Sequence, residues 1–130
     1  MLIEQEKNNI ETDNAIVLLS EKLHSGVVAI IASRLLKQYH KPAVVICIDG
    51  DVGKGSIRTI KEFPLISVLN SMSHYFINYG GHDFAAGVTI KKENINAFKK
   101  SFIETANNKL TPRDVAPKLH IDTTVDFKYL

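Results

Sequence analysis

The sequence predicts an α/β fold, a mixed β-sheet flanked by helices in a single compact domain. A polar linker precedes this domain, and a strand of another domain follows it. Two observations predict the fold. Short continuous apolar runs, typical of buried strands, alternate with longer segments whose apolar residues recur every three or four positions, as on one face of a helix. The 130 residues, 45% of them apolar, suit one domain of about 100–150 residues.

The first elements follow a polar start. Residues 1–13 are charged and polar and indicate a linker or a helix remnant, so the domain begins near residue 14. The apolar run at 15–19 is short enough to favour a buried strand. From Ser25 the apolar spacing is helical, with Ser25 as N-cap, and we expect the helix to run to about Tyr39 because Pro42 stops it.

The middle of the chain predicts two strands joined by a glycine-rich turn. The β-branched run at 43–48 has the pattern of an interior strand that is covered on both faces. Gly50, Gly53 and Gly55 then break the run. A second, short strand is expected at 56–60.

Two more helices and a strand are expected after Pro64. Apolar residues between 64 and 79 recur at three- and four-residue steps and predict a helix, with the Gly-Gly pair at 80–81 as its C-cap. Residues 85–90 predict a strand, and the spacing over 95–110 predicts a final amphipathic helix.

The end of the chain predicts the start of another domain. Pro112 and Pro117 bracket a linker, and 119–127 alternates apolar and polar residues as a strand does. One strand cannot bury itself, so we expect this sequence to be a piece of a longer protein. The expected division is a domain at 14–111, followed by a linker and the start of another domain at 112–130.

Composition narrows the possible partners and the compartment. The net charge of +2 excludes a polycationic tail, so any anion site has to be a local cluster. The single cysteine, Cys47, excludes a disulfide framework and a thiolate metal cluster within the chain, which favours the cytoplasm. The apolar run at 27–32 is far shorter than the roughly 20 residues of a membrane span. The first 13 residues are too polar for a signal peptide.

The motif at 80–87, Gly-Gly-His-Asp-Phe-Ala-Ala-Gly, is the strongest candidate site. Its small side chains let a ligand approach the backbone closely, and His82 can donate a hydrogen bond to a phosphate. The alternative is a helix C-cap followed by a tightly packed strand, with His82 on the surface. A helix C-terminus repels an anion, so His82 needs a cation beside it.

That cation is expected from the strand containing Ser56 and Arg58, which share one strand face. The planar guanidinium of Arg58 suits a phosphate, and Ser56 adds a hydroxyl. The alternative is an exposed edge strand with ordinary charges. A nucleotide P-loop is excluded because glycine, instead of serine or threonine, follows Lys54.

Other candidates are weaker. His24 precedes the first long helix, whose N-terminus attracts anions, although the pattern favours simple N-capping by Ser25 with His24 in the loop. The remaining histidines, His40, His74 and His120, have no partner at metal-ligand spacing, and no Ser-His-Asp or Cys-His arrangement is recognisable. We therefore expect neither a metal site nor a catalytic residue in this chain.

Three segments together resemble a known family. They are His24-x-Gly26-Val27-Val28-x-Ile30-x-Ala32-Ser33-Arg34-Leu35, Lys54-Gly55-Ser56-x-Arg58, and Gly80-Gly81-His82-x-x-Ala85-Ala86-Gly87. This pattern is similar to the DHH-associated domain of RecJ-type single-stranded-DNA exonucleases, over about residues 14–110. The third segment alone is shared by the wider DHH phosphoesterase superfamily, and the other two point to the RecJ branch.

The resemblance implies a substrate-binding domain of a 5′-to-3′ exonuclease in DNA recombination and repair. A separate DHH domain would hold two Mn²⁺ or Mg²⁺ ions that activate the attacking water. In this chain His82, Gly80 and Gly81 would contact the terminal nucleotide of single-stranded DNA, and Arg58 and Ser56 would bind a phosphate. His24 falls on a family position without an assigned role. Residues 112–130 would be a linker and the start of the family's oligonucleotide-binding domain. The chain alone would be inactive.

The chain departs from the family pattern at two places. Leu23 replaces an aromatic residue before the histidine, and Ile57 and Thr59 replace a small residue and a serine around the arginine. Two alternatives stay open: the associated domain of an oligonucleotide or cyclic-dinucleotide phosphodiesterase, and a non-catalytic nucleotide-binding module.

Overall fold

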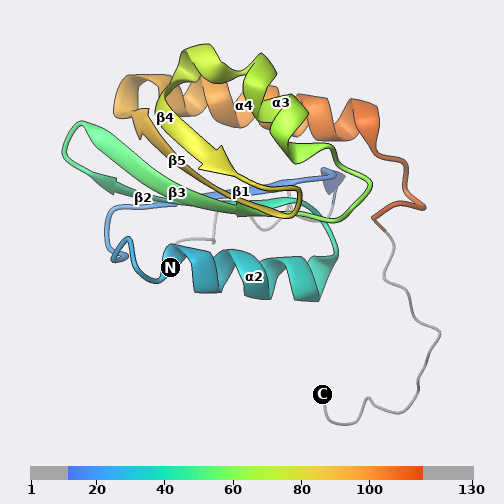
Figure 1. Cartoon of the computed structure of the whole chain (residues 1–130). Coiled ribbons are helices and arrows are strands. Elements are labelled where there is room, and N and C mark those ends of the chain that lie inside the picture. The colour runs from blue at the N-terminus through green and yellow to red at the C-terminus, as the bar shows by residue number, and fades with distance from the viewer. Residues whose placement is uncertain (1–11, 116–130) are drawn as a thin grey trace, which may run out of the picture.

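A computed structural model describes residues 12–115 of the chain, which form a five-stranded mixed sheet with helices on both faces (Figure 1). The strands are β1 (Ile16–Ser20), β2 (Ala43–Asp49), β3 (Val52–Arg58), β4 (Phe76–Gly81) and β5 (Ala85–Lys91). The helices are α2 (Val28–Tyr39), α3 (Leu65–Ser71) and α4 (Lys92–Lys109), with a 3₁₀ turn, η2, at Ser73–Tyr75. The predicted fold class is therefore confirmed.

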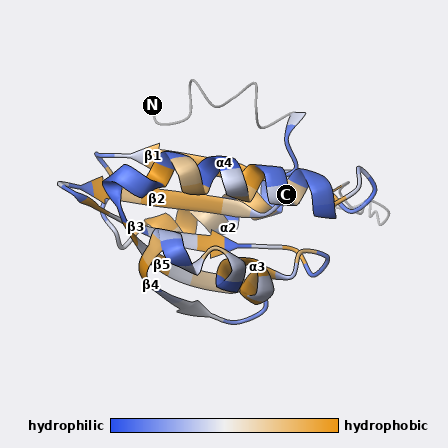
Figure 2. Cartoon of the chain, turned by 90° about the horizontal axis from the view of Figure 1, so that it is seen from above, coloured by the Kyte–Doolittle hydropathy of each residue, from blue (hydrophilic) through white to orange (hydrophobic). Residues whose placement is uncertain are grey.

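The order of the strands is β1-β2-β3-β5-β4. β1 and β2 are parallel, joined by the α2 crossover, and every other pair is antiparallel. α2 packs on one face of the sheet, while α3 and α4 lie on the other (Figure 1). The core is split accordingly, and β2 contributes alternate residues to both halves. Its continuous apolar sequence, which is orange along β2 in Figure 2, thus reflects burial on both faces.

Two of the three glycines predicted as a turn, Gly53 and Gly55, lie within a strand instead. β3 already begins at Val52, and only Gly50, with φ of 66°, is in the turn. Gly53 and Gly55 are opposite Ile48 and Ile46, and a Cβ at either glycine would come within 2.8 Å of the Ile46 side chain. Glycine at these positions therefore makes room for Ile46 in the core.

The predicted helix over 64–79 is wrong in its second half. α3 ends at Ser71, and the chain then enters β4 through η2. The misleading signal has a physical cause: an irregularity in the register between Phe76 and Asn78 lets Phe76 and Tyr79 both pack on the core, three residues apart. Helical spacing thus arises here in a bulged strand.

The Gly-Gly pair therefore belongs to β4 and does not cap a helix. The repulsion of an anion that was expected from the end of the helix over 64–79 therefore does not apply to His82.

The ends of the elements show smaller corrections. Val27, not Ser25, is the N-cap of α2, and no side chain caps that end. The expected strand at 119–127 and most of the linker at 1–13 lie outside the described residues. Within residues 12–115, no helix is both long and apolar enough to cross a membrane.

The packing at Gly55 gives a first prediction. Gly55→Ala should lower the free energy of unfolding by about 1–3 kcal/mol, because its Cβ would lie 2.8 Å from Ile46 Cγ1 and 3.1 Å from the Val45 carbonyl oxygen. Urea denaturation measures the loss. Gly80→Ala, where a Cβ meets nothing within 4 Å, is the control and should stay within about 0.5 kcal/mol of the original chain. Equal effects of the two substitutions would contradict the assigned packing.

Candidate functional site

Among residues 12–115, no helix covers the β5–β4 part of the sheet face on which α2 packs. On the face toward α2, β2 is buried, because α2 packs against β2 and β3. Beyond β3 the cover ends, and the corresponding residues of β5 and β4 become accessible, with Gly87 and Gly80 exposed. We call this surface the open sheet face. It consists of Lys54, Ser56 and Arg58 of β3, Ala85, Gly87 and Thr89 of β5, and Gly80 of β4.

A flat row crosses the middle of the open sheet face. Ser56 pairs with Gly87, and Gly87 pairs with Gly80. Neither glycine is required by the fold: a Cβ at Gly80 meets nothing within 4 Å, and at Gly87 the nearest atom is 3.8 Å away. Neither backbone has a positive φ. The missing side chains leave space outside the protein, which suits a ligand that lies directly on the backbone.

Gly81 differs from these two glycines. A Cβ there would overlap the Ala85 carbonyl oxygen and the Ala86 backbone, so the narrow hairpin itself excludes a side chain. The Gly-Gly pair thus combines a residue required by the fold with one that leaves the surface open.

Arg58 supplies positive charge at one end of this row. It is half-buried and pairs with Ala85 across β3 and β5. Its Nη1 donates a hydrogen bond to the Ile57 carbonyl oxygen at 3.0 Å. Among residues 12–115 no carboxylate forms a salt bridge with it. The guanidinium charge is therefore uncompensated beside a flat, accessible surface, as expected of a phosphate site.

The turn between β4 and β5 carries His82 to the same end of the sheet. Its backbone N–H donates to the Ala85 carbonyl oxygen at 2.8 Å, and Ala85 is the partner of Arg58. The Thr59 N–H donates to the Phe84 carbonyl oxygen at 3.0 Å, which fastens the turn to the end of β3. The structure thus brings together the two segments that carry Arg58 and His82.

The imidazole of His82 is exposed and oriented by its own turn. The Phe84 N–H donates to His82 Nδ1 at 3.4 Å. With Nδ1 as acceptor, a neutral imidazole carries its proton on Nε2 and can donate it to an oxygen of a ligand. Phe84, which the sequence did not single out, is 51% exposed in this turn. Its signal was its position in the motif, an aromatic residue among small ones.

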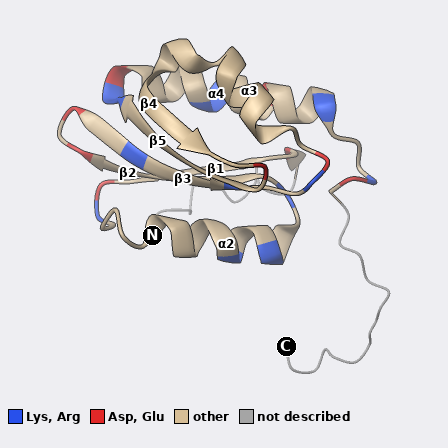
Figure 3. Ribbon diagram, in the orientation of Figure 1, with Lys and Arg blue, Asp and Glu red and all other residues tan. Residues whose placement is uncertain are grey.

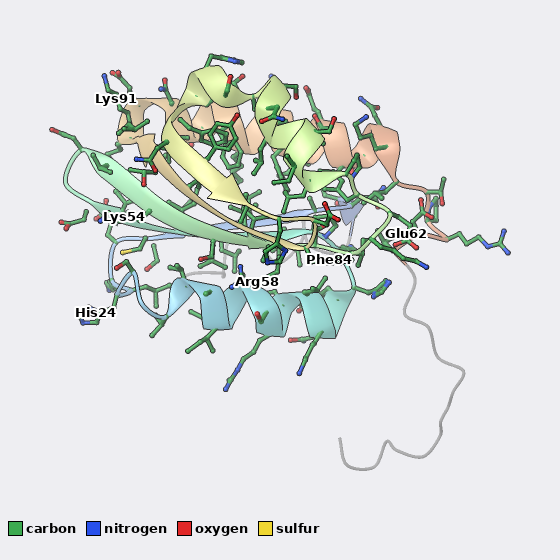
Figure 4. All side chains as sticks on the ribbon, in the orientation of Figure 1. His24, Lys54, Arg58, Glu62, Phe84 and Lys91 are labelled. Atoms are coloured by element: carbon green, nitrogen blue, oxygen red, sulfur yellow. The ribbon has the colours of Figure 1, made fainter. Side chains whose placement is uncertain are left out.

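His24 does not join this group. It lines a hollow of about 270 Å³ with Lys54, Cys47 and Asp49 at the opposite end of β3. Figure 4 shows His24 and Lys54 away from Arg58 and Phe84. From Lys54 to Arg58, four residues of strand span about 13 Å. His24 and Arg58 therefore do not contact one small ligand group together.

The described residues do not fit a metal centre. In residues 12–115, no three side chains of His, Cys, Asp or Glu are grouped as ligands of one ion. The site described above consists of cationic and neutral hydrogen-bond donors. These donors suit an anion and are not the oxygen ligands that Mn²⁺ or Mg²⁺ requires.

One match to a known protein family covers both the fold and the three motif segments. The family model of the DHHA1 domain matches residues 12–108. The chain belongs to the DHHA1 domain family. The resemblance drawn from the three motif segments is thereby confirmed, and the open sheet face is a surface of a DHHA1 domain.

The relatives that the chain matches are RecJ proteins. It is 37% identical over 110 residues to the single-stranded-DNA-specific exonuclease RecJ of Bacillus subtilis (strain 168), covering 83% of this chain and 14% of that protein. The crystal structure of RecJ in complex with Mn²⁺ from Thermus thermophilus matches with a TM-score of 0.69 and 29% identity, over 82% of this chain and 17% of that one. The chain thus spans less than a fifth of either relative.

The C-Ala domain of alanyl-tRNA synthetase from Aquifex aeolicus also matches, with a TM-score of 0.53 and 16% identity over 67% of this chain and 88% of that domain. This likeness concerns the fold alone, so the function has to be argued from the site.

The two kinds of glycine in this DHHA1 domain give a second prediction. Gly81→Ala should lower the free energy of unfolding by about 2 kcal/mol or more, since the hairpin must move to admit a Cβ. Gly87→Ala should stay within about 0.5 kcal/mol. Thermal and urea unfolding measure both. A loss at Gly87 as large as that at Gly81 would mean that the fold, and not a ligand, requires glycine at Gly87.

Proposed function

We propose that this DHHA1 domain is the substrate-binding part of a RecJ-like 5′-to-3′ exonuclease acting on single-stranded DNA in repair and recombination. The observation that carries the proposal is the uncompensated Arg58 guanidinium beside the Ser56–Gly87–Gly80 row. The names of the relatives support exonuclease activity and single-stranded DNA as the substrate.

Each group at the site has a role in holding the end of the strand. Arg58 binds the terminal phosphate through its planar fork, and the Ser56 hydroxyl donates a neutral hydrogen bond to a phosphate oxygen. His82 donates from Nε2 to the same nucleotide. The open backbone at Gly80 and Gly87 lets the sugar lie against β4 and β5. Gly81 supports this arrangement by keeping the hairpin narrow.

Hydrolysis belongs to a DHH domain of a longer protein in this proposal. A divalent metal there would supply the nucleophilic water, as suggested by the Mn²⁺ in the Thermus thermophilus RecJ crystal structure. The described residues contain no set of ligands for that metal. The contribution of this chain is to bind and orient the strand, with residues 112–130 leading into an oligonucleotide-binding domain.

In this proposal His24 has a different role from Arg58 and His82. It lies beside Lys54 at the far end of the open sheet face. We therefore assign it a contact away from the terminal phosphate.

The relatives favour this function over the alternatives. The Bacillus subtilis relative and the Thermus thermophilus crystal structure are both RecJ proteins, which favours a RecJ-type exonuclease over an oligonucleotide or cyclic-dinucleotide phosphodiesterase and over a non-catalytic module. The uncompensated arginine also favours a phosphorylated ligand over a neutral one.

Replacing the guanidinium tests the phosphate contact. Arg58→Gln should weaken binding of a 5′-phosphorylated thymidine dinucleotide to this chain by about tenfold or more, because a hydrogen bond to a charged group contributes about 1.5–3 kcal/mol. NMR titration at low salt measures the dissociation constant and shows whether the fold is intact. Lys100→Gln on α4 removes the same charge on the other face of the sheet and should leave binding unchanged. Equal binding by Arg58→Gln and the original chain would contradict the proposal.

The division of labour is tested by an activity assay. This chain with Mn²⁺ should leave single-stranded DNA intact, whereas a longer protein that includes a DHH domain should release nucleotides from the 5′ end. Gel analysis of 5′- and 3′-labelled oligonucleotides distinguishes intact DNA from DNA that is shortened from its 5′ end. Cleavage activity that copurifies with this chain and depends on Arg58 would overturn the assignment of hydrolysis to another domain.

A further inference from the structure

A second cationic surface adjoins Arg58. Ile30, Ser33, Arg34 and Lys37 follow the i, i+3, i+4, i+7 spacing of one stripe on α2. Arg34 and Lys37 are exposed, and Ile30 is 55% exposed although it is a large apolar residue. The whole of α2 contains no Asp or Glu, as Figure 3 shows. This stripe is not used by the terminal-nucleotide site.

The stripe and Arg58 line one groove. Its cavity volume is about 300 Å³, and its lining residues are Ala29, Ile30, Ser33, Arg34, Lys37 and Arg58. Three of these side chains are cationic, and within residues 12–115 no acidic side chain lines the groove. Arg58 therefore stands at the junction of the open sheet face and the α2 groove.

We propose that the α2 groove binds the stretch of single-stranded DNA that follows the terminal nucleotide. This inference rests on the proposed function. Arg34 and Lys37 contact the phosphates beyond the one held by Arg58, and Ile30 packs against a base or sugar. The groove then determines how strongly a longer strand binds relative to a dinucleotide.

Charge and composition favour a nucleic acid as the occupant. The chain as a whole has a formal charge of +2, so three cations around one groove without an acidic neighbour are a local concentration. A strand of nucleic acid presents phosphates at regular intervals together with apolar faces of bases. The lining offers both matching features, cations along one helix stripe and exposed aliphatic surface at Ile30.

Binding as a function of strand length tests the inference. The probes are 5′-phosphorylated thymidine oligomers of two and six nucleotides, and the protein is the full chain. The hexanucleotide should bind the original chain more tightly than the dinucleotide. The double variant Arg34→Gln/Lys37→Gln should lose about tenfold in affinity for the hexanucleotide and keep its affinity for the dinucleotide.

The salt dependence gives an independent readout. Each phosphate contact on a single strand contributes about 0.7 to the slope of log affinity against log salt, so the double variant should lose about 1.4 from that slope. The matched control, Lys100→Gln/Lys109→Gln, removes two charges from exposed positions of α4 and should change neither quantity.

The outcomes separate this inference from the function on which it rests. If Arg58→Gln weakens the dinucleotide but Arg34→Gln/Lys37→Gln leaves the hexanucleotide unaffected, the α2 groove serves another partner, such as a protein domain, and only this inference fails. If the original chain binds the hexanucleotide no better than the dinucleotide, the inference also fails. If neither oligonucleotide binds, both proposals fail.

Discussion

The antiparallel pairing of β3 with β5 is the constraint on which the rest of the molecule depends. It places Ile57 opposite Ala86 in the core and, by the same alternation, Arg58 opposite Ala85 toward the open sheet face. Because side chains alternate along a strand, a slip of one residue would bury Arg58 and expose Ile57. The hydrophobic effect that fixes this register for the core therefore also fixes the position of the guanidinium. Stability and binding geometry have one origin here.

The glycines illustrate how one residue type serves two purposes. Gly53 and Gly55 lie under Ile46, and Gly81 lies against the backbone of the neighbouring strand, so these three are required by internal packing. Gly80 and Gly87 have free space where a side chain would be. Internal packing therefore does not require glycine there, and the missing side chains leave room only for something outside the protein. The motif at 80–87 contains both kinds within eight residues. It can hold a tight hairpin and a flat binding surface at once.

The sequence predicted most of the fold because its strands and helices carry strong local signals. The continuous apolar run of β2 and the spacing along α4 indicated the correct elements. Two predictions were wrong because they depended on contacts between different segments of the chain. The helical spacing that ended at Tyr79 was produced by an irregular strand, and Gly53 looked like a turn because the Ile46 side chain above it belongs to another segment.

In the candidate site, too, the residues could be predicted from the sequence, whereas their arrangement in space could not. Arg58 and His82 were recognisable from their motifs, but their placement at one end of the sheet depends on the pairing of β3 with β5 and on the Thr59–Phe84 hydrogen bond. The groove beside α2 was even harder to predict from the sequence. Arg34 and Lys37 line a groove with Arg58 only because α2 packs next to β3 in the fold. The three residues of the row, Ser56, Gly87 and Gly80, carry neither a side-chain amide nor a carboxylate that could read a base edge. Phosphate and backbone contacts carry no sequence information. Under the proposed function, such a surface would suit an exonuclease that accepts each nucleotide in turn, whatever its base.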